Sequence, residues 1–296
     1  MALLGKNILL VFFLILLPGA AILGPILYFA LSPIFPIPFH RAMDRALLIC
    51  AVLALALFAS RIPFSKLWPF DNSAWKQLLL GYLLAAVTIQ TAIAFDYAFC
   101  GFTSAHLNGH QATSRILLAV IAAILIPPLE ETIFRGFLQG EFTRSLGWRG
   151  GLFIAAVVYM LAHFLKIPAG IDHQPVHLWS GVTALGAMFA HFGESDFFIG
   201  NLGKALNLLL LGLIFGGAFL RAGTLWLNAG LHSGLILGLL IFTGFTRPDV
   251  PPRVDGLDGD MISSPVTGVV LVLLGLWLWR FYRHPSVLPE TGANAP

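Results

Sequence analysis

Charge is the scarcest property of this sequence. Asp, Glu, Lys and Arg make up only 10% of its 296 residues, whereas soluble domains carry roughly 25%. Hydrophobic residues account for 58%, so a soluble fold would have too little polar surface to cover itself. This composition excludes an ordinary soluble domain and indicates an integral, multi-pass membrane protein.

Cysteine is nearly absent as well, with Cys50 inside one apolar run and Cys100 at the end of another. Two such thiols form neither a disulfide framework nor a zinc-finger pattern. The formal net charge is only +3, and the basic residues are scattered among the connections between apolar runs, as expected near the borders of a membrane. We therefore expect the lipid bilayer, and no nucleic acid, as a partner.

Long apolar runs are what the sequence has in plenty. A membrane-spanning helix requires about 20 mostly apolar residues. Eight stretches qualify once their flanks are included: Ile8–Leu31, Ala46–Ala59, Leu78–Phe99, Ile116–Phe137, Leu152–Leu165, Ala205–Leu220, Leu225–Phe242 and Val266–Trp279. Proline-rich or polar connections separate most of them, at Ser32–Phe39, Arg61–Asn72, Gly101–Thr113, Phe142–Gly150 and Thr246–Ser264.

The segment 176–192 is moderately apolar too, but it contains several polar side chains, among them His177, Ser180 and His191. We expect an interfacial or re-entrant element there instead of a ninth span. The sequence thus predicts an all-α polytopic membrane protein with about eight transmembrane helices.

The most unusual charges lie in the stretch Pro127–Phe137, where two adjacent acids and an arginine follow an uncharged apolar run. A charge near hydrocarbon costs a few kcal/mol, so it is a functional candidate by default. Glu131 and Arg135 are four residues apart, lie on one helix face and can pair. Glu130 lies about 100° away around the helix. We interpret Glu131–Arg135 as a structural pair and Glu130 as the acid that does chemistry; a helix-end network at the bilayer surface is the alternative.

Two histidines lie in other apolar runs, His163 at the end of the fifth span and His232 inside the seventh. Tyr159 precedes His163 by one helical turn, and Asn228 precedes His232 by one turn. Polar side chains in a membrane bundle face inward and towards one another. We therefore expect the two imidazoles to converge on Glu130, with Tyr159 and Asn228 in supporting positions.

One Glu and two His permit two mechanisms. In the first, Glu130 is the general base for a water, and His163 and His232 hold that water or a developing oxyanion, so no cofactor is needed. In the second, the same three residues hold a zinc ion whose bound water is the nucleophile. The residue pattern leaves both open.

These motifs resemble the CPBP intramembrane proteases, also called the Abi or type II CAAX-protease family. The family's first motif is Glu-Glu-x-x-x-Arg, which Glu130, Glu131 and Arg135 match completely. Its second motif is Phe-x-x-x-His, which His163 matches, with Tyr159 in place of Phe.

The third motif of the family has a His and usually an Asn four residues later. His232, preceded by Leu225-Trp226, matches the His, but Ile236 occupies the position of the Asn. Asn228 lies one turn before His232 and is the candidate to replace it. The resemblance covers residues 116–240, with the three motifs in order on separate spans.

The resemblance implies that the chain hydrolyses a peptide bond inside the membrane, with Glu130 as the base and His163 and His232 completing the water and oxyanion site. It implies a membrane-associated protein or peptide as substrate, which in eukaryotic members often ends in a prenylated cysteine. Bacterial members are linked to bacteriocin maturation or immunity, or to cleavage of C-terminal sorting signals. We expect a multi-pass protein of a bacterial inner membrane. On this basis we divide the chain into N-terminal helices (1–110), a catalytic core (111–245), and a polar loop, last helix and disordered tail (246–296).

Three other functions compete with this interpretation. The absence of the usual Asn favours a catalytically inactive scaffold or immunity protein of the same fold. Paired Glu and His in a membrane also suit a proton-coupled transporter, but the paired, broken repeats of transporters are missing. A rhomboid-type serine protease would need Ser180 and His191 on two spans, and they share one short segment. His173 and His177 have metal-ligand spacing, although a solvated loop explains them better.

Overall fold

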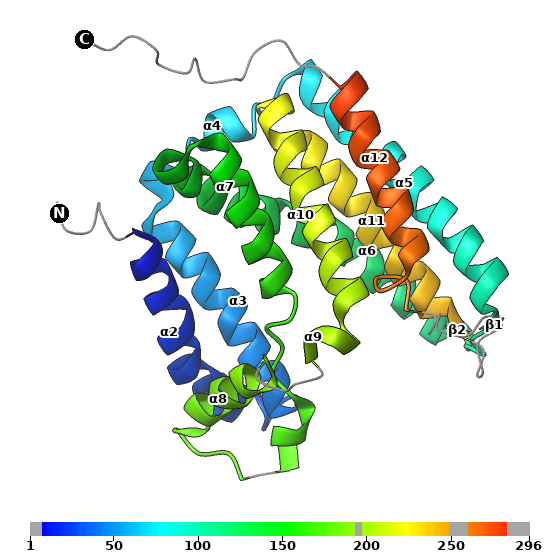
Figure 1. Ribbon diagram of the computed structural model, residues 1–296. Helices are drawn as coiled ribbons and strands as arrows, with labels where there is room; N and C mark the ends of the chain where they lie inside the picture. Colours follow the sequence, from blue (N-terminus) through cyan, green and yellow to red (C-terminus); the bar gives the residue numbers. More distant parts are fainter. Residues whose placement is uncertain (1–7, 174, 193–196, 249–259, 283–296) are drawn as a thin grey trace, which may run out of the picture. The chain divides into compact units, whose positions relative to one another are not determined.

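The computed structural model describes residues 8–173, 175–192, 197–248 and 260–282. Within them the chain is almost entirely helical (Figure 1), which confirms the predicted all-α class. The helices are α2 (Ile8–Leu31), α3 (Phe39–Leu57), η1 (Ala59–Arg61), α4 (Phe64–Leu67), α5 (Asn72–Cys100), α6 (Gly109–Glu131), η2 (Thr132–Gln139), α7 (Gly140–Ala162), η3 (Ala169–His173), α8 (Ser180–Phe192), α9 (Phe197–Gly200), α10 (Leu202–Ala222), α11 (Trp226–Phe245) and α12 (Pro265–Phe281). Two short strands, β1 (Phe102–Ser104) and β2 (Thr246–Pro248), pair antiparallel.

Each of the eight apolar stretches predicted as spans lies mostly within a helix. Five helical segments of the described chain are long and apolar enough to cross a membrane, at Ile8–Leu31, Asn72–Phe99, Gly109–Ala162, Leu202–Ala222 and Trp226–Phe245. The third of these is 54 residues long and contains two of the predicted spans. With 13 residues, α8 is about 20 Å long, too short for a hydrocarbon layer of about 30 Å, so it is not a ninth span.

The predicted polar connection at Phe142–Gly150 is reduced to a single break at Gly147, because the chain is helical on both sides of that residue. Glu141 pairs with Arg144 one turn later, and the Ser145 hydroxyl donates to the Glu141 carbonyl at 3.1 Å. These local contacts stabilise the helix through the polar residues. The direction changes only at Gly147, whose φ of 73° is a conformation that glycine adopts without steric cost.

The chain forms two compact units, each made of two chain segments. The first contains residues 1–62 and 161–201. In it, Gly24 of α2 packs against the Met43 sulfur of α3, and Gly181 of α8 packs against the backbone of α2 at Ala21. Small residues thus let the three helices approach closely.

The second unit contains residues 63–160 and 202–296, and its centre is the contact between α5 and α11. Gly230, Gly234 and Gly238 lie on one face of α11, four residues apart. A Cβ on Gly234 would come within 2.6 Å of the Ala85 Cβ on α5, and one on Gly230 would overlap the Leu78 carbonyl. This glycine stripe permits backbone contact between membrane helices. His232, two residues from Gly230, consequently lies on the opposite face of α11.

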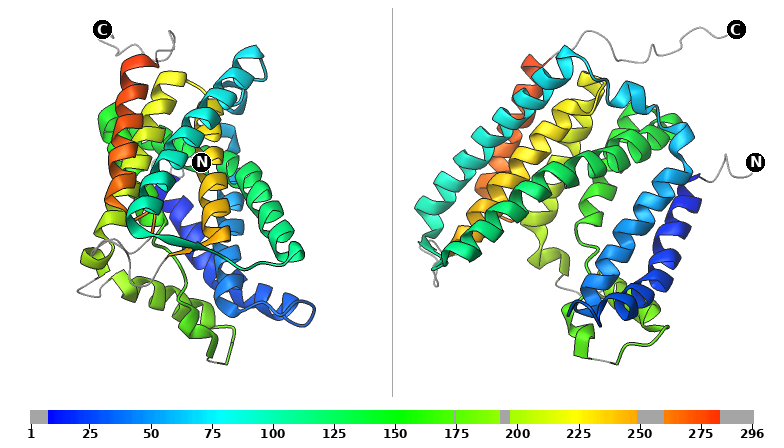
Figure 2. Two further views of the ribbon diagram at one scale, coloured as in Figure 1. Left: turned by 90° about the vertical axis from the view of Figure 1, so that its right-hand side faces the viewer. Right: turned by 180° about the vertical axis from the view of Figure 1, so that it is seen from behind.

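Helices α10 and α12 run parallel in the second unit (Figure 2). Near their first turns, the Asn207 amide donates to the carbonyls of Ile262 and Ser264 at 2.8 and 2.9 Å. At the other end, Arg221 donates to the Tyr282 carbonyl at 3.0 Å. The pair is therefore fastened at both ends by polar contacts.

Candidate active site

Glu131 is the centre of a buried polar cluster in the second unit. Its side chain is fully buried at the end of α6. One carboxylate oxygen accepts a hydrogen bond from Arg135 at 3.2 Å and lies 3.0 Å from Nδ1 of His232; the other accepts from the Asn228 amide at 3.0 Å. The predicted pair with Arg135 is thus present, and two groups from α11 join it.

Arg135 is compensated by aromatic rings as well as by the carboxylate. Its side chain is buried, and the guanidinium carbon lies 4.4 Å from the ring centre of Tyr159 and 5.0 Å from that of Phe215. A desolvated cation over aromatic faces gains electrostatic stabilisation. Tyr159, predicted as a supporting residue, therefore lies against the ion pair of Glu131.

His232 connects the two adjacent acids. Its ring stacks on Phe215, with centroids 5.1 Å apart. Glu131 accepts hydrogen bonds from two other donors, so we assign it as an ionised acceptor and His232 Nδ1 as a donor to it. The lone pair of Nε2 then faces Glu130, whose Oε2 lies 3.8 Å away, beyond hydrogen-bond range.

Glu130 lies beside this cluster and is partly open. Its side chain is 28% exposed, but the Oε2 atom is buried and has no hydrogen-bond partner within the described part of the chain. A buried carboxylate oxygen without a partner is costly and calls for a donor. The two acids therefore differ as predicted: Glu131 is enclosed by partners, whereas Glu130 is partly open beside an imidazole.

Asn228 supports Glu131 and does not offer a free donor. Its amide nitrogen donates to Glu131 at 3.0 Å and to the Phe215 carbonyl at 2.7 Å. Both amide protons are thereby used. Asn228 can orient Glu131. In this conformation, however, it has no proton left to donate to a substrate carbonyl in place of the missing Asn of the third motif. Ile236, at the usual Asn position, is half-buried on the same helix.

Sequence reasoning missed the roles of Pro127 and Ser233. Proline lacks an N–H, so Pro127 leaves the Ala123 carbonyl of α6 without its helical donor. The Ser233 hydroxyl of α11 donates to that carbonyl at 2.7 Å. This hydrogen bond joins α11 to α6 at the residue that follows His232. The proline within an apolar helix was the feature of the sequence that could have indicated it. The chain then continues as the π-helical η2, a form that is frequent at functional sites.

The predicted site residues are divided between the two units. His163 directly follows α7 and belongs to the first unit, whereas Glu130 and His232 belong to the second. Its convergence with them stays a prediction. The described residues contain no group of three His, Cys, Asp or Glu side chains suited to a metal ion, so the zinc set also stays a prediction.

The competing residues of the first unit have local roles where the structure describes them. The Ser180 hydroxyl accepts the backbone N–H of His177 at 2.8 Å at the start of α8, a helix-start contact. His177 is exposed, and His191 is on the same helix as Ser180. The side chain of His173 lies outside the description.

The cluster around Glu131 thus places two adjacent acids beside a buried histidine in a helical bundle. Residues 112–237 match the family model described as type II CAAX prenyl endopeptidase Rce1-like. This stretch contains the three motifs in order, and the match confirms for this domain the family predicted from them, the CPBP/CAAX proteases. No curated protein and no solved structure matches the chain. The long apolar helices, together with this match, indicate an integral membrane protein.

Proposed function

We propose that the chain is an intramembrane endopeptidase in which Glu130 activates a water. The observation that carries the proposal is the pair of facing acceptors, Oε2 of Glu130 and Nε2 of His232, at 3.8 Å. A water about 2.8 Å from each atom can donate one hydrogen to each. Its oxygen lone pairs then point away from both and are available to a substrate carbonyl.

The reaction needs only a proton carrier and an oxyanion site. As the water oxygen bonds to the peptide carbonyl carbon, Glu130 accepts the proton, and the carbonyl oxygen becomes an oxyanion. When the carbon–nitrogen bond breaks, Glu130 returns that proton to the leaving nitrogen, giving an acid and an amine. His232 holds the water, and we assign the predicted oxyanion contact to His163.

Glu131 acts one step back from the chemistry. Its bond to Nδ1 keeps the His232 proton on that nitrogen and Nε2 free to accept from the water. Arg135 and Asn228 hold Glu131 in place from two sides. Two acids adjacent in sequence thus take different tasks, since one is committed to protein donors and the other to the water.

The substrate class follows from the family description alone. A prenyl endopeptidase cleaves near a lipid-modified C-terminus, and we propose a membrane-associated peptide or protein as the substrate here, with a bacterial inner membrane as the location. The alternative, a catalytically inactive scaffold, is favoured by one observation, the apolar Ile236 at the usual Asn position.

Substituting the proposed base, Glu130, distinguishes an active endopeptidase from an inactive scaffold. Glu130→Gln keeps the shape of the side chain but cannot accept the proton, so we expect cleavage to fall about 100-fold or more. The rate is measured in proteoliposomes with a quenched fluorescent peptide ending in a farnesylated Cys-a-a-X sequence, and with its unprenylated counterpart. Glu141→Gln is the matched control, because Glu141 is a largely buried acid of the same unit that pairs with Arg144, outside the cluster.

A search that assumes no substrate completes the test. Membranes containing wild-type protein or Glu130→Gln are incubated, and newly formed peptide N-termini are labelled and identified by mass spectrometry. N-termini that require Glu130 support the protease. If a folded Glu130→Gln variant and the wild type gave identical sets of N-termini, the protease proposal would be wrong and the inactive scaffold would be favoured.

A further inference from the structure

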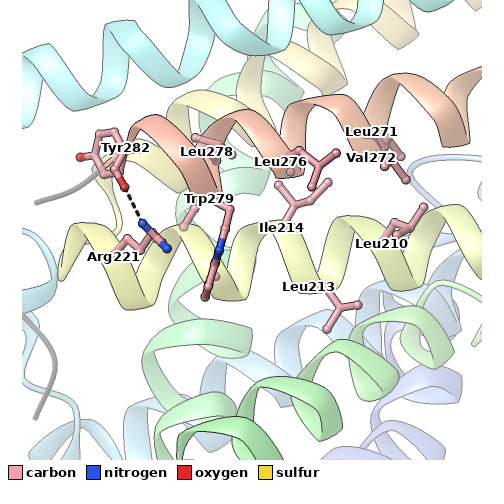
Figure 3. A pocket seen from close by; sticks show the side chains of 13 residues that line it. Leu210, Leu213, Ile214, Arg221, Leu271, Val272, Leu276, Leu278, Trp279 and Tyr282 are labelled. Atoms are coloured by element: carbon pink, nitrogen blue, oxygen red, sulfur yellow. Dashed lines mark hydrogen bonds between the residues drawn. The ribbon is translucent and has the colours of Figure 1, made fainter.

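A groove outside the candidate site runs between α10 and α12 (Figure 3). It has a volume of about 250 Å³. On α10 its lining follows one helix face, through Leu210, Ile214, Gly217 and Arg221. These positions are three or four residues apart, so the groove follows the helix axis.

The groove has the length of one leaflet of a bilayer. Leu210 and Arg221 are eleven residues apart, which corresponds to about 16 Å along the helix. Half of a hydrocarbon layer of about 30 Å is about 15 Å. Its lining is almost entirely apolar, and Val272 and Leu276 on its α12 side are 42% and 60% exposed. In a membrane-spanning pair of helices, such a face meets lipid.

The middle of the groove is hollow because glycines line it. A Cβ built on Gly217 meets no atom within 4 Å, so the space above it is open. Gly275 of α12 lines the same groove. Any larger side chain at Gly217 would therefore enter the groove without displacing the backbone.

A cation closes one end. The Arg221 guanidinium lies 4.1 Å from the Trp279 ring centre and donates one hydrogen bond to the Tyr282 carbonyl. A guanidinium has five N–H donors, and no carboxylate of the described residues pairs with Arg221. Figure 3 shows Arg221, Trp279 and Tyr282 towards one end and Leu210 and Leu271 at the other. Trp and Tyr mark the boundary between hydrocarbon and headgroups in membrane proteins.

We propose that this groove binds one acyl chain of an anionic phospholipid, with the phosphate held by Arg221. The apolar length fits the chain, and the unpaired N–H groups at its end fit phosphate oxygens.

Native mass spectrometry in detergent tests the proposal with phosphatidylglycerol and with phosphatidylcholine of the same acyl chains. We expect the wild type to bind one phosphatidylglycerol in preference to phosphatidylcholine. Gly217→Leu fills the groove and should lower the binding of both lipids. Arg221→Gln should keep the acyl chain but reduce the preference for phosphatidylglycerol about fivefold.

Two matched controls separate the groove from general effects. Gly140→Leu adds the same side chain at another helical glycine with no atom within 4 Å of a built Cβ. Arg280→Gln removes the same charge from the end of α12 at a residue that does not line the groove. Elution volume and melting temperature verify that each variant is folded.

We expect Gly217→Leu to lose lipid binding and Arg221→Gln to lose the preference for phosphatidylglycerol. Both controls should bind lipid as the wild type does. Unchanged lipid binding by folded Gly217→Leu would overturn the proposal. So would an equal loss of preference in Arg221→Gln and Arg280→Gln, which would indicate surface charge alone. Co-purified peptide in place of lipid would overturn it too.

Discussion

At the scale of the residue, the site depends on how differently two neighbouring acids are surrounded. Glu131 contacts Arg135, Asn228 and His232 within hydrogen-bond distance. The contact of Glu130 with His232 is longer, with Oε2 3.8 Å from Nε2 of His232. Adjacent residues on a helix point about 100° apart, so one acid can be enclosed while its neighbour stays partly exposed.

Glu131→Ala should destabilise the protein strongly. It leaves the Arg135 charge buried without its carboxylate, a change that typically costs about 3–5 kcal/mol, and it also releases His232 and Asn228. We expect a clear fall in the melting temperature of the detergent-solubilised protein. Glu130→Ala is the comparison, because it removes the neighbouring acid without breaking that pair. Equal melting temperatures for the two variants would contradict the structural role of Glu131.

The local contacts of this site could be predicted from the sequence, whereas the contacts between helices could not. The Glu131–Arg135 pair was predictable, since both groups lie on one helix four residues apart. The contact between Glu131 and His232 joins positions 101 residues apart, and its existence depends on how α6 packs on α11. Spacing along the chain contains no information on that packing. The inward orientation of polar side chains in a membrane bundle and the family resemblance indicated that these residues lie near one another, but neither indicated this contact.

At the scale of the element, the glycine stripe of α11 determines where His232 lies. Gly230→Ala should displace α11 from α5, because the added Cβ would overlap the Leu78 carbonyl and come within 2.9 Å of the Tyr82 nitrogen. Backbone atoms cannot rotate away as a side chain can. We expect a stability loss of about 2 kcal/mol or more and a matching loss of cleavage.

The control for this prediction is Gly140→Ala. A Cβ on Gly140 meets nothing within 4 Å, so alanine there should be neutral or stabilise the helix by up to about 1 kcal/mol. Thermal unfolding of both variants is compared in the same detergent. If Gly230→Ala melted like Gly140→Ala, close packing of α5 on α11 would not be what positions His232.

The existence of the helices was predictable because a bilayer requires long apolar segments, and each of the eight predicted stretches lies mostly within a helix. The ends of elements were harder. Polar residues at Phe142–Gly150 suggested a loop, yet Glu141, Arg144 and Ser145 satisfy one another within a helix. The π-helical η2 was not predicted either. It follows Pro127 and Pro128, which lack N–H groups, and its hydrogen-bond pattern cannot be read from the apolar periodicity.

At the scale of the whole molecule, the predicted site draws on both units. Glu130, Glu131 and His232 come from the second unit, and His163 comes from the first. α7 contains the boundary between Met160 and Leu161, so Tyr159 and His163 are one helical turn apart in sequence but in different units. The proposed oxyanion contact of His163 therefore requires a defined association of the units.

Cysteine cross-linking tests that association. In a background with Cys50→Ala and Cys100→Ala, we expect Glu130→Cys and His163→Cys to be joined by a short bifunctional thiol reagent, because both side chains would surround one water. The control pair is Glu130→Cys with His177→Cys, since His177 is exposed in the same unit as His163. Cross-linked peptides are identified by mass spectrometry after proteolysis. If both cysteines of the first pair react singly with maleimide but never with each other, His163 is not part of the site, and the oxyanion must be stabilised by another donor.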